Sequence, residues 1–265
     1  MWLWSRGLLG AFAMLPVVDC AAQDAASSWD WSGYVTQGWS ISDRNDFYGD
    51  SSDGNGSFGY REVGANGAFR LSPQFRLSGQ LLSRLAGEAD DGDLRVDYLF
   101  ADWSFLQNSS QQAGLRLGRI KNPIGFYNDT RDVAFTRPSI ILPQSLYLDA
   151  IRELSLSSDG FGGYFRSQPD YGSWMVDLLW GSPLTSTDSE VTLLDTDWPG
   201  ELENSELALA RVLYEHGGGG IRLAVTFIDA NSDFETLAPH LIPNGEIDFE
   251  LQSYSAQLNF ERVSL

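Results

Sequence analysis

Apolar and polar residues alternate one by one along much of this chain, and no other feature of the sequence restricts its fold as strongly. Between Glu62 and Leu71, for example, Val63 and Phe69 fall on one parity, whereas Glu62 and Arg70 fall on the other. Because successive side chains of a β-strand point to opposite faces, a period of two predicts strands. The alternation recurs in about ten segments, near residues 31–41, 62–71, 75–84, 94–100, 115–117, 160–166, 173–180, 205–214, 220–228 and 249–260.

In these segments, the residues that alternate with the apolar ones include charged side chains. A soluble β-sandwich, which is the alternative fold, also alternates but exposes such charges only on its outer faces. A sheet with one apolar face and charged side chains on the other face is typical of a barrel with a polar interior. The predicted interior wall consists of Glu62, Arg70, Arg76, Arg84, Arg95, Asp97 and Arg116. The same alternation predicts that Phe100 shares the apolar face with Leu94 and Val96.

The connections between the segments are alternately short and long. Short ones lie at residues 72–73, 108–112, 167–171 and 216–219, and long ones at residues 42–57, 86–93, 121–159, 182–204 and 229–248. Short periplasmic turns that alternate with long external loops are the pattern of outer-membrane barrels. Lipid also requires every backbone polar group of such a sheet to be paired, so the sheet has to close. The sequence therefore predicts an all-β, antiparallel transmembrane β-barrel in one domain.

The first 22 residues predict export. One arginine, Arg6, precedes an apolar run that is too short to span a bilayer, and the small residues Ala21 and Ala22 follow it. We expect a cleaved signal peptide at residues 1–22 and a barrel domain at residues 23–265. Cleavage would also remove Cys20, the single cysteine. The formal net charge of -19 argues against a nucleic-acid partner.

The segment from Lys121 to Asp159, after the fifth predicted strand, is unusually long and is not low in complexity. It contains three prolines, several aromatic residues and the apolar residues Ile140, Ile141, Leu142 and Leu146. Long structured loops are usually functional. We expect this one to fold inward and narrow the lumen, the alternative being an external loop that packs on its neighbours. Its charged candidates are Asp129, Arg131, Asp132, Arg137, Asp149, Arg152 and Glu153.

The stretch from Gly118 to Asp132, which reads GRIKNPIGFYNDTRD, resembles the strand end and the start of the constriction loop in Gram-negative outer-membrane diffusion porins. The resemblance implies a water-filled channel for small hydrophilic solutes and ions, an inward third external loop and a homotrimer. The Pro-Glu-Phe-Gly motif of general porins is absent. Loop acids opposite wall arginines would sort solutes by size and charge.

Other functions are less well supported. Residues 23–265 contain only two histidines, His216 and His240, and neither forms a catalytic constellation with a serine and an acidic residue. We therefore expect neither an enzyme nor a cofactor or metal site. A non-conducting structural or adhesive barrel is the main alternative, and a barrel hydrolase is a weaker one. The acidic external loops predict either a solvated surface or divalent cations that bridge to lipopolysaccharide, a partner alongside outer-membrane lipid.

The chain stops at Val263-Ser264-Leu265 without the terminal aromatic residue that outer-membrane barrels normally carry. An inward loop of about forty residues would also overfill a barrel of about ten strands, since the interior widens with strand number. The sequence therefore predicts part of a barrel of about sixteen strands.

Overall fold

The computed structural model describes residues 28–43, 54–87, 90–133, 136–139, 142–143, 145–147, 152–185, 200–240, 242–260 and 263–264. The predicted signal peptide, residues 1–22, lies outside this part of the chain, as do most of the predicted loops at residues 42–57 and 182–204.

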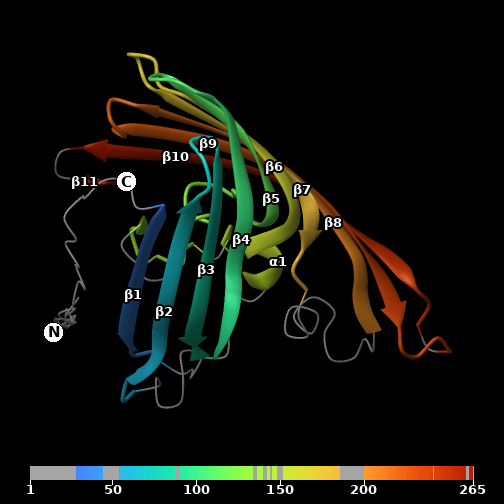
Figure 1. Cartoon of the computed structure of the whole chain (residues 1–265). Helices are drawn as coiled ribbons and strands as arrows, with labels where there is room; N and C mark the ends of the chain where they lie inside the picture. The colour runs from blue at the N-terminus through green and yellow to red at the C-terminus, as the bar shows by residue number, and fades with distance from the viewer. Residues whose placement is uncertain are drawn as a thin grey trace. The chain divides into compact units, whose positions relative to one another are not determined.

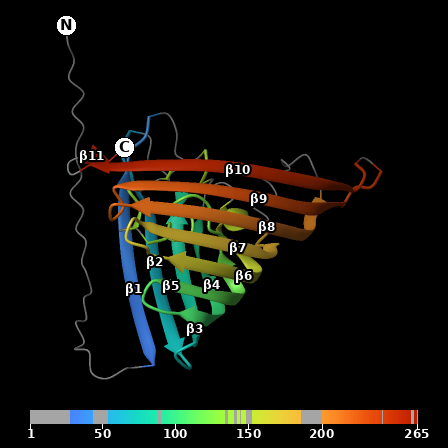
Figure 2. The same cartoon turned by 90° about the horizontal axis from the view of Figure 1, so that it is seen from above.

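The described chain folds into one antiparallel sheet of 11 strands, each hydrogen-bonded to its neighbours in sequence (Figures 1 and 2). The elements are β1 (Trp29–Ser40), β2 (Ser57–Arg70), β3 (Phe75–Ala86), β4 (Asp91–Gln107), β5 (Gln111–Lys121), α1 (Arg152–Leu156), β6 (Ser157–Ser167), β7 (Ser173–Pro183), β8 (Gly200–His216), β9 (Ile221–Thr236), β10 (Gly245–Phe260) and β11 (Val263–Ser264). The prediction of an all-β antiparallel fold is confirmed, and β1 to β10 correspond to the ten alternating segments.

The strand order of the described residues begins at β1 and ends at β11, so the sheet is open and its closure into a barrel stays a prediction. No helix within the described part of the chain is long and apolar enough to cross a membrane.

The chain divides into two compact units. The N-terminal unit contains residues 32–65 and 82–95, and the main unit contains residues 28–31, 66–81 and 96–265. The main unit holds all of β5 to β11, the helix α1 and the long segment between β5 and β6.

The two faces of the sheet in the main unit have opposite character. On the apolar face, Leu117 is 67% exposed and Trp180 50% exposed. On the polar face, Asp177, Arg211 and Thr226 are all buried. Apolar side chains thus lie on the surface while charged ones are enclosed, the reverse of the usual distribution in a soluble domain.

The boundary of the apolar face crosses the strands obliquely. Leu117, Phe161, Trp180 and Ala208 occupy consecutive positions of one cross-strand row, which continues into Asp229 on β9 and Glu250 on β10. The same row is therefore apolar on β5 to β8 and acidic on β9 and β10. A band with this oblique boundary has the strands tilted relative to it, as in membrane barrels.

The alternation changes phase within β4. Val96 and Leu99, three residues apart, are both exposed, whereas Phe100 packs against the buried cluster of the polar face and lies 5.1 Å from the guanidinium carbon of Arg116. The prediction that put Phe100 on the apolar face is wrong. The phase changes at Asp97, where the carboxylate is held by a buried ion pair with Lys121.

Candidate functional site

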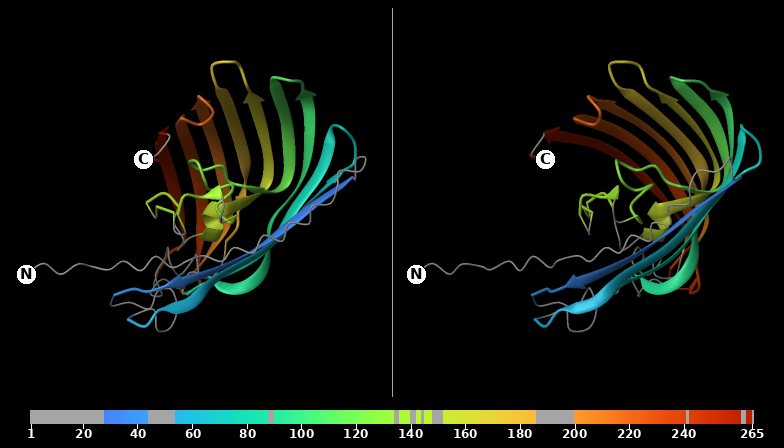
Figure 3. Two further views of the ribbon diagram at one scale, coloured as in Figure 1. Left: turned by 90° about the vertical axis from the view of Figure 1, so that its left-hand side faces the viewer. Right: turned by 60° about the vertical axis from the view of Figure 1, so that its left-hand side comes forward.

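The segment between β5 and β6 lies against the polar face of β8 to β10 (Figure 3). The Gly125 N–H donates to Thr226 Oγ1 at 3.2 Å, and the Gly125 carbonyl accepts from Arg211 Nη1 at 3.1 Å. Farther along, the Tyr127 hydroxyl donates to Gln257 Oε1 at 2.7 Å. These bonds connect the segment to three successive strands, so it crosses the polar face instead of projecting away from the sheet.

Apolar packing holds the first part of the segment in place. Ile124 joins a buried cluster with Ile120, Leu179 and Ile228, and Leu146 packs against that cluster. Of the predicted apolar anchors, Leu142 is also buried, and Ile140 and Ile141 lie outside the described residues.

Tyr147 fixes the backbone of the segment. Its hydroxyl oxygen accepts the N–H groups of Phe126 and Tyr127 at 3.0 and 3.3 Å. Burial raises the pKa of the Tyr147 phenol above its ordinary value. Gly125 beside it has φ +56°, and a Cβ there would lie 2.5 Å from the Tyr147 hydroxyl.

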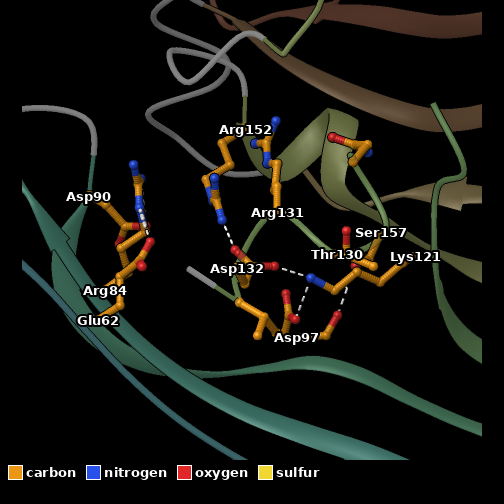
Figure 4. A network of polar contacts seen from close by, with 12 residues as sticks. Glu62, Arg84, Asp90, Asp97, Lys121, Thr130, Arg131, Asp132, Arg152 and Ser157 are labelled. Atoms are coloured by element: carbon orange, nitrogen blue, oxygen red, sulfur yellow. Dashed lines mark hydrogen bonds and ion pairs between the residues drawn. The ribbon is translucent and has the colours of Figure 1, made fainter. Parts of the chain in front are cut away.

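Four charged side chains form a buried ionic cluster at the base of the segment: Asp97, Lys121, Asp132 and Arg152 (Figure 4). Lys121 Nζ lies 2.5 Å from Asp97 Oδ2, and Asp132 pairs with both Lys121 and Arg152. None of the four side chains is more than 9% exposed. Buried charges are tolerated because they are paired, so each member depends on the others.

Amide side chains join the two ends of the segment just beside the ionic cluster. Asn128 Nδ2 donates to the carbonyls of Asn122 at 2.9 Å and Ser155 at 2.7 Å. The Ser158 hydroxyl donates to Asn122 Oδ1 at 2.9 Å. The start and end of the segment are thereby held together at the edge of β5 and β6.

A chain of ion pairs leads from the segment across the polar face. Arg211 Nη2 lies 3.1 Å from Asp129 on the segment and 2.8 Å from Asp177 on β7. Asp177 also pairs with Arg166 on β6 at 2.5 Å. Arginines and carboxylates therefore alternate along this line.

Arg222 meets the aromatic part of the segment. Its guanidinium carbon lies 4.7 Å from the ring centre of Phe126 and 5.7 Å from that of Tyr127. Arg222 also bonds Glu215 at 2.7 Å and Gln257 at 3.1 Å. A guanidinium over aromatic rings gains cation–π attraction, which here helps to hold the segment on β9 and β10.

The predicted constriction residues occupy two environments. Asp129 pairs with Arg211 at the polar face, and Arg137 donates to the carbonyl of Arg131 at 2.8 Å. Arg131, Asp132 and Arg152 are almost fully buried. Asp149 lies outside the described residues, and for Glu153, in α1, the structure describes the backbone alone.

The predicted wall residues also differ among themselves. In the main unit, Asp97 belongs to the ionic cluster, Arg116 pairs with Asp102, and Arg70 and Arg76 are exposed at strand ends.

The N-terminal unit contains its own buried charge group (Figure 4). Arg84 Nε lies 3.4 Å from Glu62, and Arg84 and Arg95 both pair with Asp90. The Tyr60 hydroxyl donates to Glu62 at 2.8 Å.

Sequence reasoning overlooked several polar-face residues. These are Asp102, Arg166, Asp177, Arg211 and Arg222. A signal was present for most of them, because Arg211 stands between Ala210 and Val212 and Arg222 between Ile221 and Leu223 in alternating segments. The alternation rule applied to β6 to β9 would have assigned their arginines to the polar face.

Among the described residues, no group of three or more His, Cys, Asp or Glu side chains could hold a metal ion. No protein-family model and no curated protein sequence matches this chain.

Proposed function

We propose that this chain is an outer-membrane porin, which forms a water-filled channel for the passive diffusion of small hydrophilic solutes and ions. The observation that carries the proposal is the inverted distribution of side chains in the main unit. Leu117, Leu178 and Trp180 are at least half exposed on one face, while Asp177 and Arg211 are buried behind the other. A lipid-facing apolar surface around a polar interior is the arrangement of outer-membrane channels.

The size of the apolar face supports a lipid environment. Exposed large apolar side chains occur on each of β4 to β10 in the main unit, from Val96 to Phe260. A contiguous patch of this extent on a soluble monomer would be an aggregation hazard, whereas lipid would cover it favourably. A hollow of about 640 Å³ on this face lies between Phe161, Trp180 and Phe227 and reaches the acidic residues Asp229 and Glu250 at its border.

Closure of the sheet into a barrel belongs to the same proposal. An open sheet edge leaves unpaired backbone groups, which hydrocarbon does not tolerate, so membrane insertion requires further pairing at the ends of the strand order. The resemblance at Gly118–Asp132 adds a homotrimeric assembly to this expectation, with outer-membrane lipid and lipopolysaccharide as partners.

The position of the segment between β5 and β6 supports a channel over a sealed barrel. It lies on the polar face and carries charge there, because Asp129 pairs with Arg211 while 32% of the Asp129 side chain stays exposed. Side chains of Arg116, Arg166 and Arg222 are 20–29% exposed on the same face. Exposed charges of both signs would line a narrow aqueous passage and sort solutes by size and charge.

A structural or adhesive barrel without a channel is the competing proposal. The two differ in whether the polar face holds connected water. A barrel sealed by side chains would need few exposed charges there, so the exposed arginines favour the channel.

Planar-bilayer recording tests the proposal. The protein, with the further strands that closure of the sheet requires, would be refolded in detergent, checked for β-structure by circular dichroism and added to one side of a bilayer in about 1 M KCl. Stepwise conductance increases are expected. β-structured protein that inserts into lipid vesicles without any conductance would favour the structural barrel. Protein that stays soluble and does not bind vesicles would refute both.

A further inference from the structure

The guanidinium of Arg116 is held in place on its Nε side, and its two terminal nitrogens are left without a bond to any described residue. Its Nε bonds Asp102 Oδ2 at 3.0 Å, and its guanidinium carbon lies 5.1 Å from the ring centre of Phe100 and 4.6 Å from that of Tyr164. Among the described residues, its two terminal nitrogens have no hydrogen-bond partner, and its side chain is 29% exposed. The guanidinium is thus oriented by aromatic contacts and one anchor, with two donors left unused.

Glycine makes this orientation available. A Cβ at Gly114 would lie 2.5 Å from the Tyr164 hydroxyl, so only glycine lets the Tyr164 ring cross β5 at this point. The hydroxyl then reaches β4, where it lies 2.7 Å from Ser104 Oγ and donates to Asp102 Oδ1 at 2.9 Å. Asp102 is 4% exposed and has both oxygens engaged. It therefore orients the Nε side of Arg116 without occupying the outer edge.

The neighbouring arginines differ from Arg116. Arg211 uses all three of its nitrogens, on Gly125, Asp129 and Asp177. Arg166 gives Nη1 to the carbonyls of Phe165 and Val176 and Nη2 to Asp177. These two arginines stabilise the polar face, whereas Arg116 keeps a pair of coplanar donors available to a solute.

We propose that Arg116 is a subsite for the carboxylate group of small organic acids that pass along the polar face, an inference that rests on the proposed channel. The parallel N–H groups of a guanidinium edge match the two oxygens of a carboxylate. Asp102 balances the charge of Arg116, so recognition depends on the geometry of the edge more than on excess positive charge. A weak, oriented contact of this kind suits transit, which requires that a bound solute also leaves.

Block of the open channel by benzoate tests the subsite. Benzoate is added to a KCl bath during single-channel recording, and benzamide, which has nearly the same shape without the charge, is the reference solute. For the wild-type chain we expect a saturable decrease in current with benzoate and none with benzamide. Arg116→Lys keeps the charge but loses the paired donors, and should raise the half-blocking benzoate concentration about tenfold.

Arg119→Lys is the matched control. Arg119 lies on the same strand, is paired with Asp159 at 2.8 Å and sits three residues farther along, on the parity of Leu115 and Leu117. Its replacement should leave benzoate block unchanged. Phe100→Leu, which removes one of the two rings that orient Arg116, should give an intermediate loss. Saturation-transfer NMR of benzoate on the detergent-refolded proteins measures the same ranking without any need for conductance.

The outcomes separate the two proposals. Open wild-type channels with no benzoate block and no NMR contact would overturn the subsite and leave the porin proposal intact. Equal block in the wild type and in a folded Arg116→Lys variant would also overturn it. A wild-type protein that inserts but never conducts would overturn the porin proposal and, with it, the transit role of Arg116.

Discussion

The base of the long segment and the polar face beyond it use the same kinds of charged residue to different effect. At the base, Lys121, Asp132 and Arg152 are almost fully enclosed and pair with one another. On the polar face, Arg116 and Arg166 pair with carboxylates while 29% and 25% of their side chains stay exposed. Full burial makes a charge depend on its partner, whereas partial exposure lets water share the charge. The base is therefore suited to fixing the segment, and the polar face to meeting solutes.

The largest expected effect breaks the base. Asp132→Asn removes the carboxylate that both Lys121 and Arg152 contact and leaves two buried cations with less compensation. We expect a loss of about 3 kcal/mol in the free energy of unfolding. Tryptophan fluorescence during urea unfolding in detergent measures it.

Asp129→Asn is the matched comparison, because Asp129 is on the same segment but 32% exposed. Its loss should cost less, about 1 kcal/mol, because Asp177 still pairs with the buried Arg211 at 2.8 Å. Equal losses of unfolding free energy for the two variants would mean that full burial does not make the base depend more strongly on its ion pairs than the polar face does.

Deletion of residues 130–148 tests whether the segment limits the passage. Because conductance depends most on the narrowest section, single-channel conductance should rise, and larger sugars should enter liposomes that contain the variant. Liposome swelling with sugars of graded size measures the second effect. Unchanged conductance with an intact sheet would assign the segment a role outside the current path.

Gly125→Ala should loosen the segment locally. The residue has φ +56°, and the added methyl group would meet the Tyr147 hydroxyl. We expect a loss of about 1–3 kcal/mol, with proteolysis inside the segment accelerated more than global unfolding. Gly217→Ala is a useful control, since that glycine has a similar φ of +60° but no atoms near the added carbon. A larger loss for Gly217→Ala would contradict the proposed contact.

The smallest expected effect is a change in ion preference caused by the exposed arginines of the polar face. Arg166→Ala and Arg222→Ala together should shift the reversal potential in a KCl gradient toward cation preference, since two exposed positive charges are removed. The double replacement of Arg84 and Arg95, in the N-terminal unit, gives a reference in which Arg84 is only 3% exposed. A larger shift from the reference pair would show that the current path follows that unit instead.

Alternation predicted the strands and most side-chain faces because it is a local property of the backbone. It correctly separated Glu62 from Val63 and Arg116 from Leu117. Ion-pair partners could not be predicted in the same way. Asp129 and Arg211 are 82 residues apart, and their contact depends on how the segment returns to the sheet. The prediction for Phe100 was wrong because the alternation changes phase at a buried ion pair, and nothing in the sequence of β4 indicates that change.

Because Asn128 binds the carbonyls of Asn122 and Ser155 together, the long segment closes on itself at a narrow neck before it extends over the sheet. Because the ends of the loop are held together, a change in its length does not move the strands at either end. The entropic cost of closing a longer loop also grows only slowly with its length. Residues could therefore be inserted between Asp132 and the anchor residues Leu142, Leu146 and Tyr147 while the strands keep their register. Changes of length or sequence in this part of the segment should therefore be compatible with an unchanged sheet.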